Sequence, residues 1–408
     1  MLKKIWKLWE DELIRSGFIL FIMINLFNFL NYFFHFVMAR ILSVENYGIL
    51  MVLISVTYVF NVPSEAISTT FSMYTTKFAN NKGRIKDLIL RGIKKAVYFS
   101  FIIYLVFIPI ALFLSYFLKI RFTLLVLTGF LLFSFFINPV LRGVLQGNKR
   151  FKSLGLSLNL EATLKIILGV LLVYLINDVY GAISGIILSA AFGFLVSLYF
   201  IKDIIIEKRK NAKVEGIYSY SWSSFMLFLI IMSMLSIDTI LAKRFFPLDI
   251  VGKYAVASII GKMIFFGTTG IAKAMFPISS EKKIKKDRII VLKKALVLTV
   301  ISIATALVIF TIIPELFVRI LFGSKYAEIS GLLVYTGLAF SFLSLSNLNI
   351  MYKLSKGEVK KSEWMFIFVI IEILMLALLN QSLFRFVIAL CLSNLLMLIG
   401  SLFLKNRE

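Results

Sequence analysis

The chain has 408 residues, of which 60% are hydrophobic and 16% are charged, and its formal net charge at pH 7 is +24. Soluble domains carry about 45–50% apolar residues, so this composition excludes an ordinary soluble protein and predicts a polytopic membrane protein. A single cysteine, Cys391, excludes an intrachain disulfide, and with a single histidine, His35, the chain cannot build a metal site from His and Cys ligands.

The chain begins with a short amphipathic segment. In residues 1–15, Leu2, Ile5, Trp6, Trp9 and Leu13 fall on one helical face beside several lysines. This pattern predicts an interfacial helix that lies on the membrane before the first span. The following apolar segment has no small-residue cleavage site, so we expect it to stay in the protein as an anchor.

Apolar runs then recur along the whole chain, each close to the 20 residues that cross about 30 Å of hydrocarbon as a helix. They predict an all-α polytopic membrane protein with about twelve transmembrane helices. The expected spans are residues 16–38, 48–74, 97–118, 122–141, 154–176, 180–201, 218–241, 254–278, 291–313, 330–351, 363–380 and 383–404.

The placement of the positive charge indicates topology rather than nucleic-acid binding. Lys and Arg gather in the N-terminus, the even-numbered connections between spans and the C-terminus, as in 82–95 and 281–288. Cytoplasmic connections carry such an excess, so we predict that both termini are cytoplasmic and that these segments face the anionic inner leaflet. No nucleic-acid partner is expected.

Two similar connectors indicate an internal duplication. "ARILSVENYG" (39–48) and "AKRFFPLDIVGKY" (242–254) align when Gly48 is placed on Gly252, an offset of 204 residues. We therefore predict two six-helix lobes related by a pseudo-twofold axis along the membrane normal, an arrangement common in transporters. The lobes are expected at 16–201 and 218–404, joined by a cytoplasmic linker at 202–217 and followed by a tail at 405–408.

Polar residues form stripes within three of the spans. Inside a membrane such residues usually face protein or a water-filled cavity. The offset of 204 places Glu65 on Thr269 and Thr69 on Lys273, so we expect two of these stripes to be equivalent faces that look toward the central axis. The stripes are Asn25, Asn28, Tyr32 and His35; Glu65, Thr69, Ser72 and Thr76; and Lys262, Thr269 and Lys273.

Other intramembrane charges leave alternatives open. Glu161 and Lys165 have the spacing of an intrahelical ion pair, but either one could instead contact a ligand. Asp238 is predicted near the outer end of its span, where Lys243 or Arg244 could pair with it. Glu372 has no predicted partner.

The chain is not expected to be an enzyme. No G-x-x-x-x-G-K-[ST] motif is present, and the single histidine leaves few ways to build a Ser-His-Asp set. The expected connections are short, which argues against a membrane-embedded glycosyltransferase or polymerase. We therefore predict no catalytic residue, no cofactor and no bound metal.

Four segments resemble a known family. They are "ARILSVENYGIL" (39–50), "LRGVLQGNKRFK" (141–152), "IDTILAKRFFPLDIVGKYAVA" (237–257) and "ELFVRILFGSKYAEIS" (315–330). They resemble connectors, in the same order, of Wzx-type polysaccharide biosynthesis flippases in the multidrug/oligosaccharidyl-lipid/polysaccharide (MOP) exporter superfamily.

The resemblance implies alternating access between two lobes. The implied substrate is an oligosaccharide on a polyprenyl phosphate or pyrophosphate, moved from the cytoplasmic to the outer leaflet for surface glycan synthesis. Such a substrate suits the residues above, because lysines can bind phosphate and polar side chains can bind sugar hydroxyls. The candidate substrate residues are Lys262, Lys273, Lys165, Thr269, Asn28, Tyr32, Thr69 and Ser72, and the candidate sites for a coupling proton or sodium ion are Glu65, Glu161 and Asp238.

Two related functions remain open: a multidrug or toxin cation antiporter of the same fold, and a lipid II-type flippase. An antiporter for organic cations predicts an acidic, aromatic cavity, against which the lysines of span eight argue. The flippases of lipid II have fourteen spans, whereas twelve are expected here. We predict a monomer in a prokaryotic cell membrane, in contact with membrane lipids and with glycan polymerases or glycosyltransferases as partners.

Overall fold

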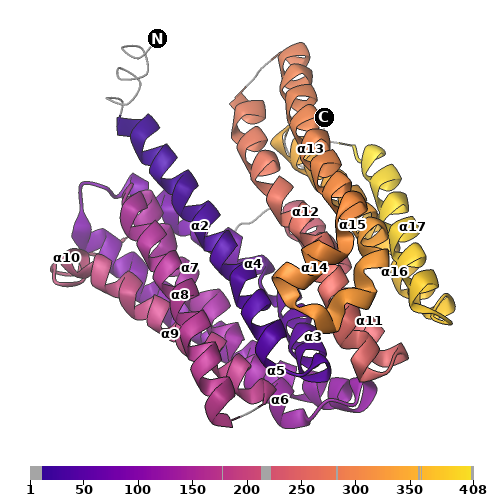
Figure 1. Ribbon diagram of the computed structural model, residues 1–408. Helices are drawn as coiled ribbons and strands as arrows, with labels where there is room; N and C mark the ends of the chain where they lie inside the picture. Colours follow the sequence, from indigo (N-terminus) through magenta and orange to yellow (C-terminus); the bar gives the residue numbers. More distant parts are fainter. Residues whose placement is uncertain are drawn as a thin grey trace. The chain divides into compact units, whose positions relative to one another are not determined.

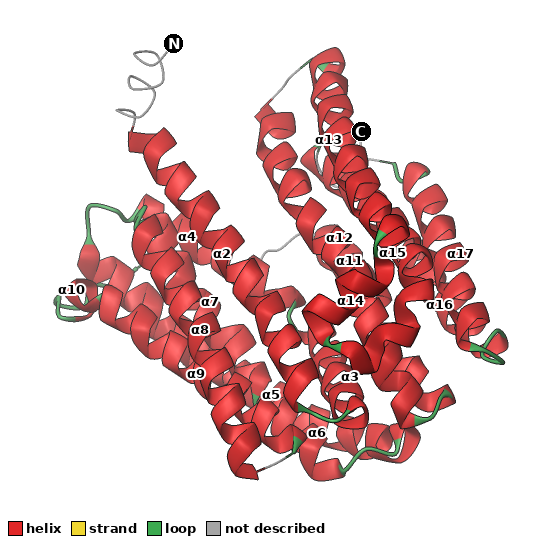
Figure 2. Ribbon diagram, in the orientation of Figure 1, coloured by secondary structure: helices red, strands yellow, loops and turns green. Residues whose placement is uncertain are grey.

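The structure is a computed structural model, and it describes residues 12–176, 178–212, 222–281, 284–356, 359 and 361–405. The described chain consists of helices joined by short loops (Figures 1 and 2). Residues 1–11 of the predicted interfacial helix, and parts of the predicted linker and tail, lie outside the described residues. Residues 12–15 belong to the first described helix.

The helices, with short 3₁₀ segments named η, follow one another along the chain. They are α2 (Glu12–Ile41), α3 (Val44–Phe60), α4 (Val62–Lys77), α5 (Lys82–Leu118), α6 (Phe122–Gly129), α7 (Leu131–Gly147), α8 (Phe151–Ile176), α9 (Val179–Phe200), α10 (Lys202–Ile205), α11 (Trp222–Phe245), α12 (Leu248–Glu281), α13 (Lys285–Ile312), α14 (Pro314–Phe322), η1 (Ser324–Leu332), α15 (Leu333–Ser355), η2 (Ser362–Met365), α16 (Phe366–Leu378) and α17 (Leu383–Leu402).

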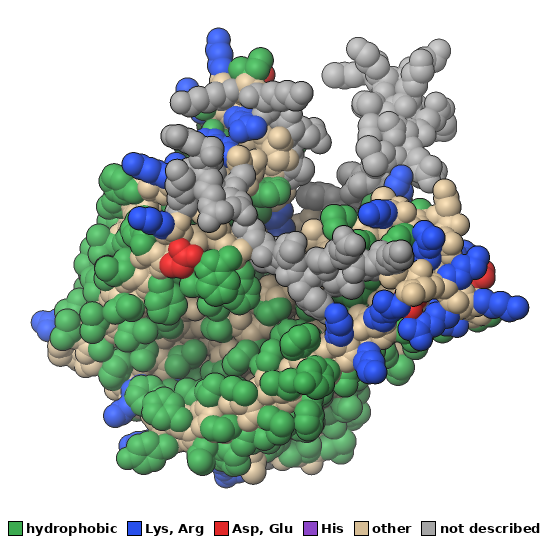
Figure 3. Space-filling view, turned by 180° about the vertical axis from the view of Figure 1, so that it is seen from behind, with side chains coloured by type: hydrophobic (Ala, Val, Ile, Leu, Met, Phe, Trp, Pro, Cys, Tyr) green, Lys and Arg blue, Asp and Glu red, His purple; other side chains and the backbone are tan. Residues whose placement is uncertain are grey.

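This arrangement confirms the prediction of an all-α polytopic membrane protein. Among the described residues, ten helices are long and apolar enough to cross a membrane, and the bent pair α3 and α4 makes eleven. The helix at the remaining predicted span, α16, has 13 residues, fewer than the roughly 20 that cross the hydrocarbon alone. Exposed side chains on the spans are largely apolar, and Figure 3 shows broad hydrophobic areas with Lys and Arg in separate groups.

The second predicted span is broken. α3 ends at Phe60 and α4 begins at Val62, with a bend of 45° between them. Pro63 explains the break, because proline has no amide hydrogen to donate and its ring collides with the carbonyl one turn earlier in a continuous helix.

The break separates two compact units of the chain. Unit 1 comprises residues 1–42 and 63–219, and unit 2 comprises residues 43–62 and 220–408. α3 belongs to unit 2, where it packs against α11 and α12.

Within unit 2, the two connectors that the sequence aligns meet each other. A Cβ atom built on Gly48 would lie 2.9 Å from the backbone nitrogen of Gly252, and one built on Gly252 would collide with the carbonyl oxygen of Val44. Only glycine lets α3 and α12 approach so closely.

Within unit 1, residues 206–212 are fastened to the first turns of α5. The buried Asp87 carboxylate accepts hydrogen bonds from Arg209 Nε at 2.6 Å and from the Ala212 amide at 2.9 Å. The Lys210 amide donates to the Gly83 carbonyl at 3.1 Å. Residues 206–212 of the predicted linker are therefore a strap bound to the first turns of α5.

A second polar contact fixes α10. Asp203 accepts two hydrogen bonds of 2.7 Å from the Arg150 guanidinium and pairs with Lys82 Nζ at 2.9 Å. The fork geometry of arginine matches a carboxylate, so this pair is well oriented. The hydrogen bonds from Arg150 hold the pKa of Asp203 well below its usual range.

Candidate functional site

The candidate residues on α2 and α4 lie in unit 1 and are accessible. Asn28 is exposed and Tyr32 is half-buried on α2. On α4, Glu65 and Thr69 are exposed and Ser72 is half-buried. The Thr69 hydroxyl donates to the Glu65 carbonyl at 2.8 Å, which is a local bond that satisfies the hydroxyl within its own helix. This set offers polar groups at the surface of unit 1.

Glu161 and Lys165 of α8 also lie in unit 1, and their hydrogen bonds go to other helices. Glu161 forms an ion pair with Arg142 of α7. Lys165 donates to Asn31 Oδ1 of α2, and its ammonium nitrogen lies 4.7 Å from the centre of the Phe34 ring. The two charges act on each other, as the four-residue spacing predicts, but each has its closest contact across a helix–helix interface.

In unit 2, Asp238 of α11 and Lys262 of α12 form a fully buried ion pair. Lys262 Nζ lies 3.0 Å from Asp238 Oδ1 and 3.1 Å from Thr239 Oγ1, and both charged side chains are 0% exposed. The Tyr254 hydroxyl donates to Asp238 Oδ2 at 2.9 Å, and the Ser258 hydroxyl donates to the same oxygen at 2.5 Å. The partner of Asp238 is therefore Lys262, instead of the neighbouring Lys243 or Arg244 considered from sequence.

Helix geometry explains how the sequence builds this cluster. Tyr254, Ser258 and Lys262 are spaced four residues apart, so they lie on one side of α12. That side faces the segment of α11 that carries Asp238 and Thr239. We name these five residues the buried centre.

The structure adds an acid that the sequence left unexplained. Glu372 of α16 is 0% exposed, and among the described residues neither of its carboxyl oxygens has a hydrogen-bond partner. The charges of Asp238 and Lys262 both act on it, so Glu372 lies within electrostatic range of the buried centre. Asn394 of the adjacent α17 is likewise buried, and its side-chain amide has no partner in the described part of the chain.

The other two candidates of α12 are accessible. Thr269 is half-buried and donates to the Phe265 carbonyl at 2.8 Å, and Lys273 is exposed. The three residues of the predicted stripe on α12 therefore lie in different environments. Lys262 is enclosed in protein, Thr269 is half-buried, and Lys273 reaches the surface of unit 2.

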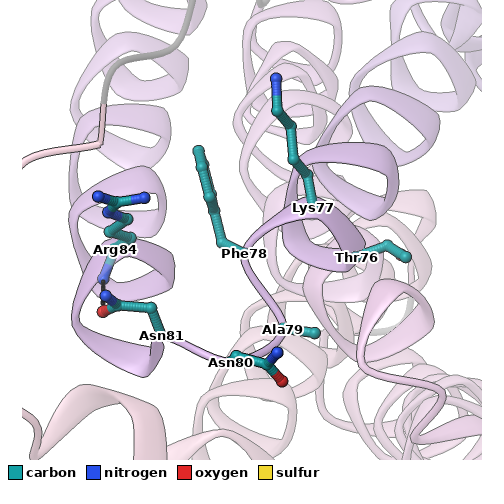
Figure 4. A pocket seen from close by; sticks show the side chains of 7 residues that line it. All are labelled: Thr76, Lys77, Phe78, Ala79, Asn80, Asn81 and Arg84. Atoms are coloured by element: carbon teal, nitrogen blue, oxygen red, sulfur yellow. Dashed lines mark hydrogen bonds between the residues drawn. The ribbon is translucent and has the colours of Figure 1, made fainter.

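A pocket of about 180 Å³ lies at the turn between α4 and α5. Its lining comes from that turn and from the helix ends beside it, and Figure 4 shows the hydrogen bond from the Arg84 amide to Asn81. Ligand pockets usually measure about 300–1,000 Å³, so this one is small for a lipid-linked sugar. None of the predicted site residues lines it; the lining residues are Thr76, Lys77, Phe78, Ala79, Asn80, Asn81 and Arg84.

Sequence reasoning did not select Tyr254, Ser258 or Glu372. A signal for the first two was present, because polar residues at 254, 258 and 262 repeat every four positions within an apolar segment. Glu372 had no such signal, since its neighbours come from helices distant in sequence.

Comparison with solved structures defines the class of fold. An inward-facing multidrug resistance MATE family transporter of the MOP superfamily is similar with a TM-score of 0.75 and 14% identity, covering 92% of each chain. The lipid II flippase MurJ, in an inward closed conformation, is similar with a TM-score of 0.68 and 15% identity over 94% of this chain and 86% of that one. The eukaryotic MATE transporter AtDTX14 gives a TM-score of 0.62 and 15% identity over 99% and 96%. The chain has the fold of MOP-superfamily transporters and flippases.

A comparison with family models identifies the family of this chain from its sequence. A family model described as polysaccharide biosynthesis protein matches residues 13–283, about two thirds of the chain. The chain belongs to the polysaccharide biosynthesis protein family, as its connector motifs predicted. A comparison with curated proteins returned no match.

Proposed function

We propose that the protein is a flippase that moves an oligosaccharide linked to a polyprenyl phosphate or pyrophosphate from the cytoplasmic to the outer leaflet of a prokaryotic cell membrane. The observation that carries this proposal is the match of residues 13–283 to the polysaccharide biosynthesis family, on a chain with the fold of MOP-superfamily transporters. A lipid anchor keeps the sugar in the membrane, so a flippase can move it to the outer leaflet, where extracellular glycan synthesis can use it.

The accessible candidates suit such a substrate. A pyrophosphate needs cations that can reach it, and Lys273 of α12 is exposed. Sugar hydroxyls need small polar partners, and Asn28 and Thr69 are exposed in unit 1. Within unit 2 we assign the pyrophosphate to Lys273 and keep Lys262 out of the substrate site, because the Lys262 ammonium is enclosed and bound to Asp238.

Thermal stability of the purified protein in detergent tests the proposal. A short-chain polyprenyl-pyrophosphate sugar is expected to raise the Tm, because a ligand that binds only the folded state stabilises it. Lys273→Ala is expected to reduce that shift. Lys286→Ala, which removes an exposed lysine of α13, is the matched control and is expected to retain it.

The same assay also tests the competing function, multidrug transport. Tetraphenylphosphonium, a lipophilic cation, is expected to leave the Tm unchanged. A shift with this cation and none with the pyrophosphate lipid would contradict the flippase and favour multidrug transport, the function named for the MATE family structures.

A further inference from the structure

Glu372 of α16 is a titratable group enclosed within unit 2. It is completely buried, and both of its carboxyl oxygens lack a hydrogen-bond partner among the described residues. An ionised carboxylate in such a place is very unstable, because burial removes its hydration and no hydrogen bond from the described residues replaces it. The neutral acid is the form that this environment accommodates.

The buried centre already has balanced charge without Glu372. The Asp238 carboxylate is bonded to the Lys262 ammonium and to two hydroxyl groups, those of Tyr254 and Ser258. The Phe340 ring of α15 covers the ammonium at 5.4 Å from its centroid. One negative and one positive charge therefore cancel, and a second carboxylate would leave the enclosed site with a net charge of −1.

Hydrogen bonding distinguishes the two acids. The Asp238 carboxylate accepts hydrogen bonds from the Tyr254 and Ser258 hydroxyls, whereas Glu372 accepts none from the described residues. A proton that enters this region therefore resides on Glu372. Lys262 acts on both carboxyls and is the cation available to compensate Glu372 when that proton leaves.

We propose that Glu372 is the proton-binding site that drives the transport cycle, with Lys262 as a built-in cation shared between Asp238 and Glu372. This deepens the proposed function and rests on it for the link to transport. In the protonated state, Lys262 pairs with Asp238 as observed. When the region opens to water, the O–H bond of Glu372 breaks, the proton passes to a water molecule, and the carboxylate left behind attracts the Lys262 ammonium.

A change of this kind biases the conformation of the protein. Moving Lys262 toward Glu372 weakens its contact with Asp238, so α11, α12 and α16 have two different preferred arrangements in the two protonation states. A ligand shifts a conformational equilibrium only through unequal affinity for the two states, and here the proton supplies that inequality. Because an ammonium already occupies the centre, the proposal requires no sodium ion.

The titratable groups whose charges interact with Glu372 or with Asp238 come from three helices. α11 contributes Asp238, and α12 contributes Lys262 and Tyr254. α3 adds Tyr58, on which the Asp238 charge acts. The titratable side chains of α17 and η2 are the exposed Arg385, the half-buried Cys391 and the exposed Glu363.

Infrared difference spectroscopy of the full chain in lipid nanodiscs tests where the proton resides. Between acid and alkaline pH, the wild type is expected to lose one carboxylic-acid band from an apolar environment. Glu372→Gln should lack this band, and Glu372→Asp should shift it. Glu363→Gln, the same change at an exposed site, should retain it. A band that persists unchanged in Glu372→Gln would overturn the assignment.

Distance measurements between spin labels test the conformational effect. In a Cys391→Ser background, labels are placed at Lys152→Cys of α8 and Lys286→Cys of α13, both exposed and one in each unit. The distance distribution is expected to change with pH in the wild type and in Glu363→Gln. Glu372→Gln imitates the neutral acid, so its distribution should be fixed in the low-pH form.

The distance distributions can contradict the proposal through their dependence on pH or on sodium. A distribution that changes equally with pH in Glu372→Gln, or one that never changes, would overturn it. Replacing NaCl by choline chloride should leave the wild-type distribution unaltered, and a sodium response would contradict the built-in cation. Neither measurement uses the lipid substrate, so a failed binding assay with the pyrophosphate lipid refutes the proposed function separately.

Discussion

Replacing Lys262 by alanine should strongly destabilise the protein. The change leaves the Asp238 carboxylate in a site where both side chains are 0% exposed, and removes the ammonium 3.0 Å from its oxygen. Removing one partner of a buried ion pair costs about 3–5 kcal/mol, chiefly because the remaining charge is uncompensated. Loss of the four-carbon stem adds a cavity beneath Phe340, so we expect the upper part of this range.

A double-mutant cycle separates the ion pair from packing. Free energies of unfolding in mixed micelles would be measured for Lys262→Met, Asp238→Asn and the double variant, with Lys273→Met as an exposed control on the same helix. Methionine retains most of the side-chain volume. Each single variant of the pair should lose about 3 kcal/mol, and the double variant should lose less than their sum because no charge remains buried.

A double variant whose loss equals the sum of the two single losses would contradict the buried ion pair. So would a single variant of the pair that behaves like Lys273→Met, which should change stability by no more than about 0.5 kcal/mol.

Three further predictions concern other parts of the chain. Gly252→Ala should destabilise the protein by about 1–3 kcal/mol through overpacking against α3, whereas Gly267→Ala on the same helix, with nothing within 4 Å of the added carbon, should be neutral or stabilising; thermal unfolding would contradict this if both behaved alike. Because folding lowers the pKa of Asp203, its contribution to the free energy of unfolding is complete above its unfolded pKa of about 4 and is lost as the pH falls through the lower folded value. Asp203→Asn should therefore reduce the loss of stability in acid by up to about 1 kcal/mol. An unchanged dependence of stability on pH in this variant would refute the prediction. Asp87→Ala should release the strap and make residues 208–210 a trypsin site, detected by mass spectrometry of the fragments, and equal protection in the variant and the wild type would exclude this anchor.

Hydrophobic patterning was sufficient to predict the class of fold. Apolar runs of about 20 residues identify spans because a backbone in lipid must satisfy its own hydrogen bonds, which a helix does locally. The pattern did not reveal the break between α3 and α4, since Asn61 and Pro63 lie within a mostly apolar run. Nor did it show that α3 packs with α11 and α12, which depends on tertiary contacts.

Sites were less accessible to sequence reasoning than spans. Helical spacing predicted that Lys262 shares a face of α12 with Thr269 and Lys273, but periodicity on one helix does not specify what the opposite helix presents. Asp238 lies 24 residues earlier, and Glu372 lies 110 residues later. Whether a lysine reaches water or a buried carboxylate depends on the rotation of packed helices about their axes, which the three-dimensional contacts reveal.

The most direct test of the central claim is transbilayer movement of the substrate. Proteoliposomes would carry a fluorescent polyprenyl-pyrophosphate sugar, and a membrane-impermeant quencher would report the fraction in the outer leaflet over time. The account predicts rapid movement with the wild type, slower movement with Lys273→Ala, and movement at the protein-free rate with Glu372→Gln. A wild-type rate equal to that of protein-free liposomes, across the range of pH, would contradict the flippase.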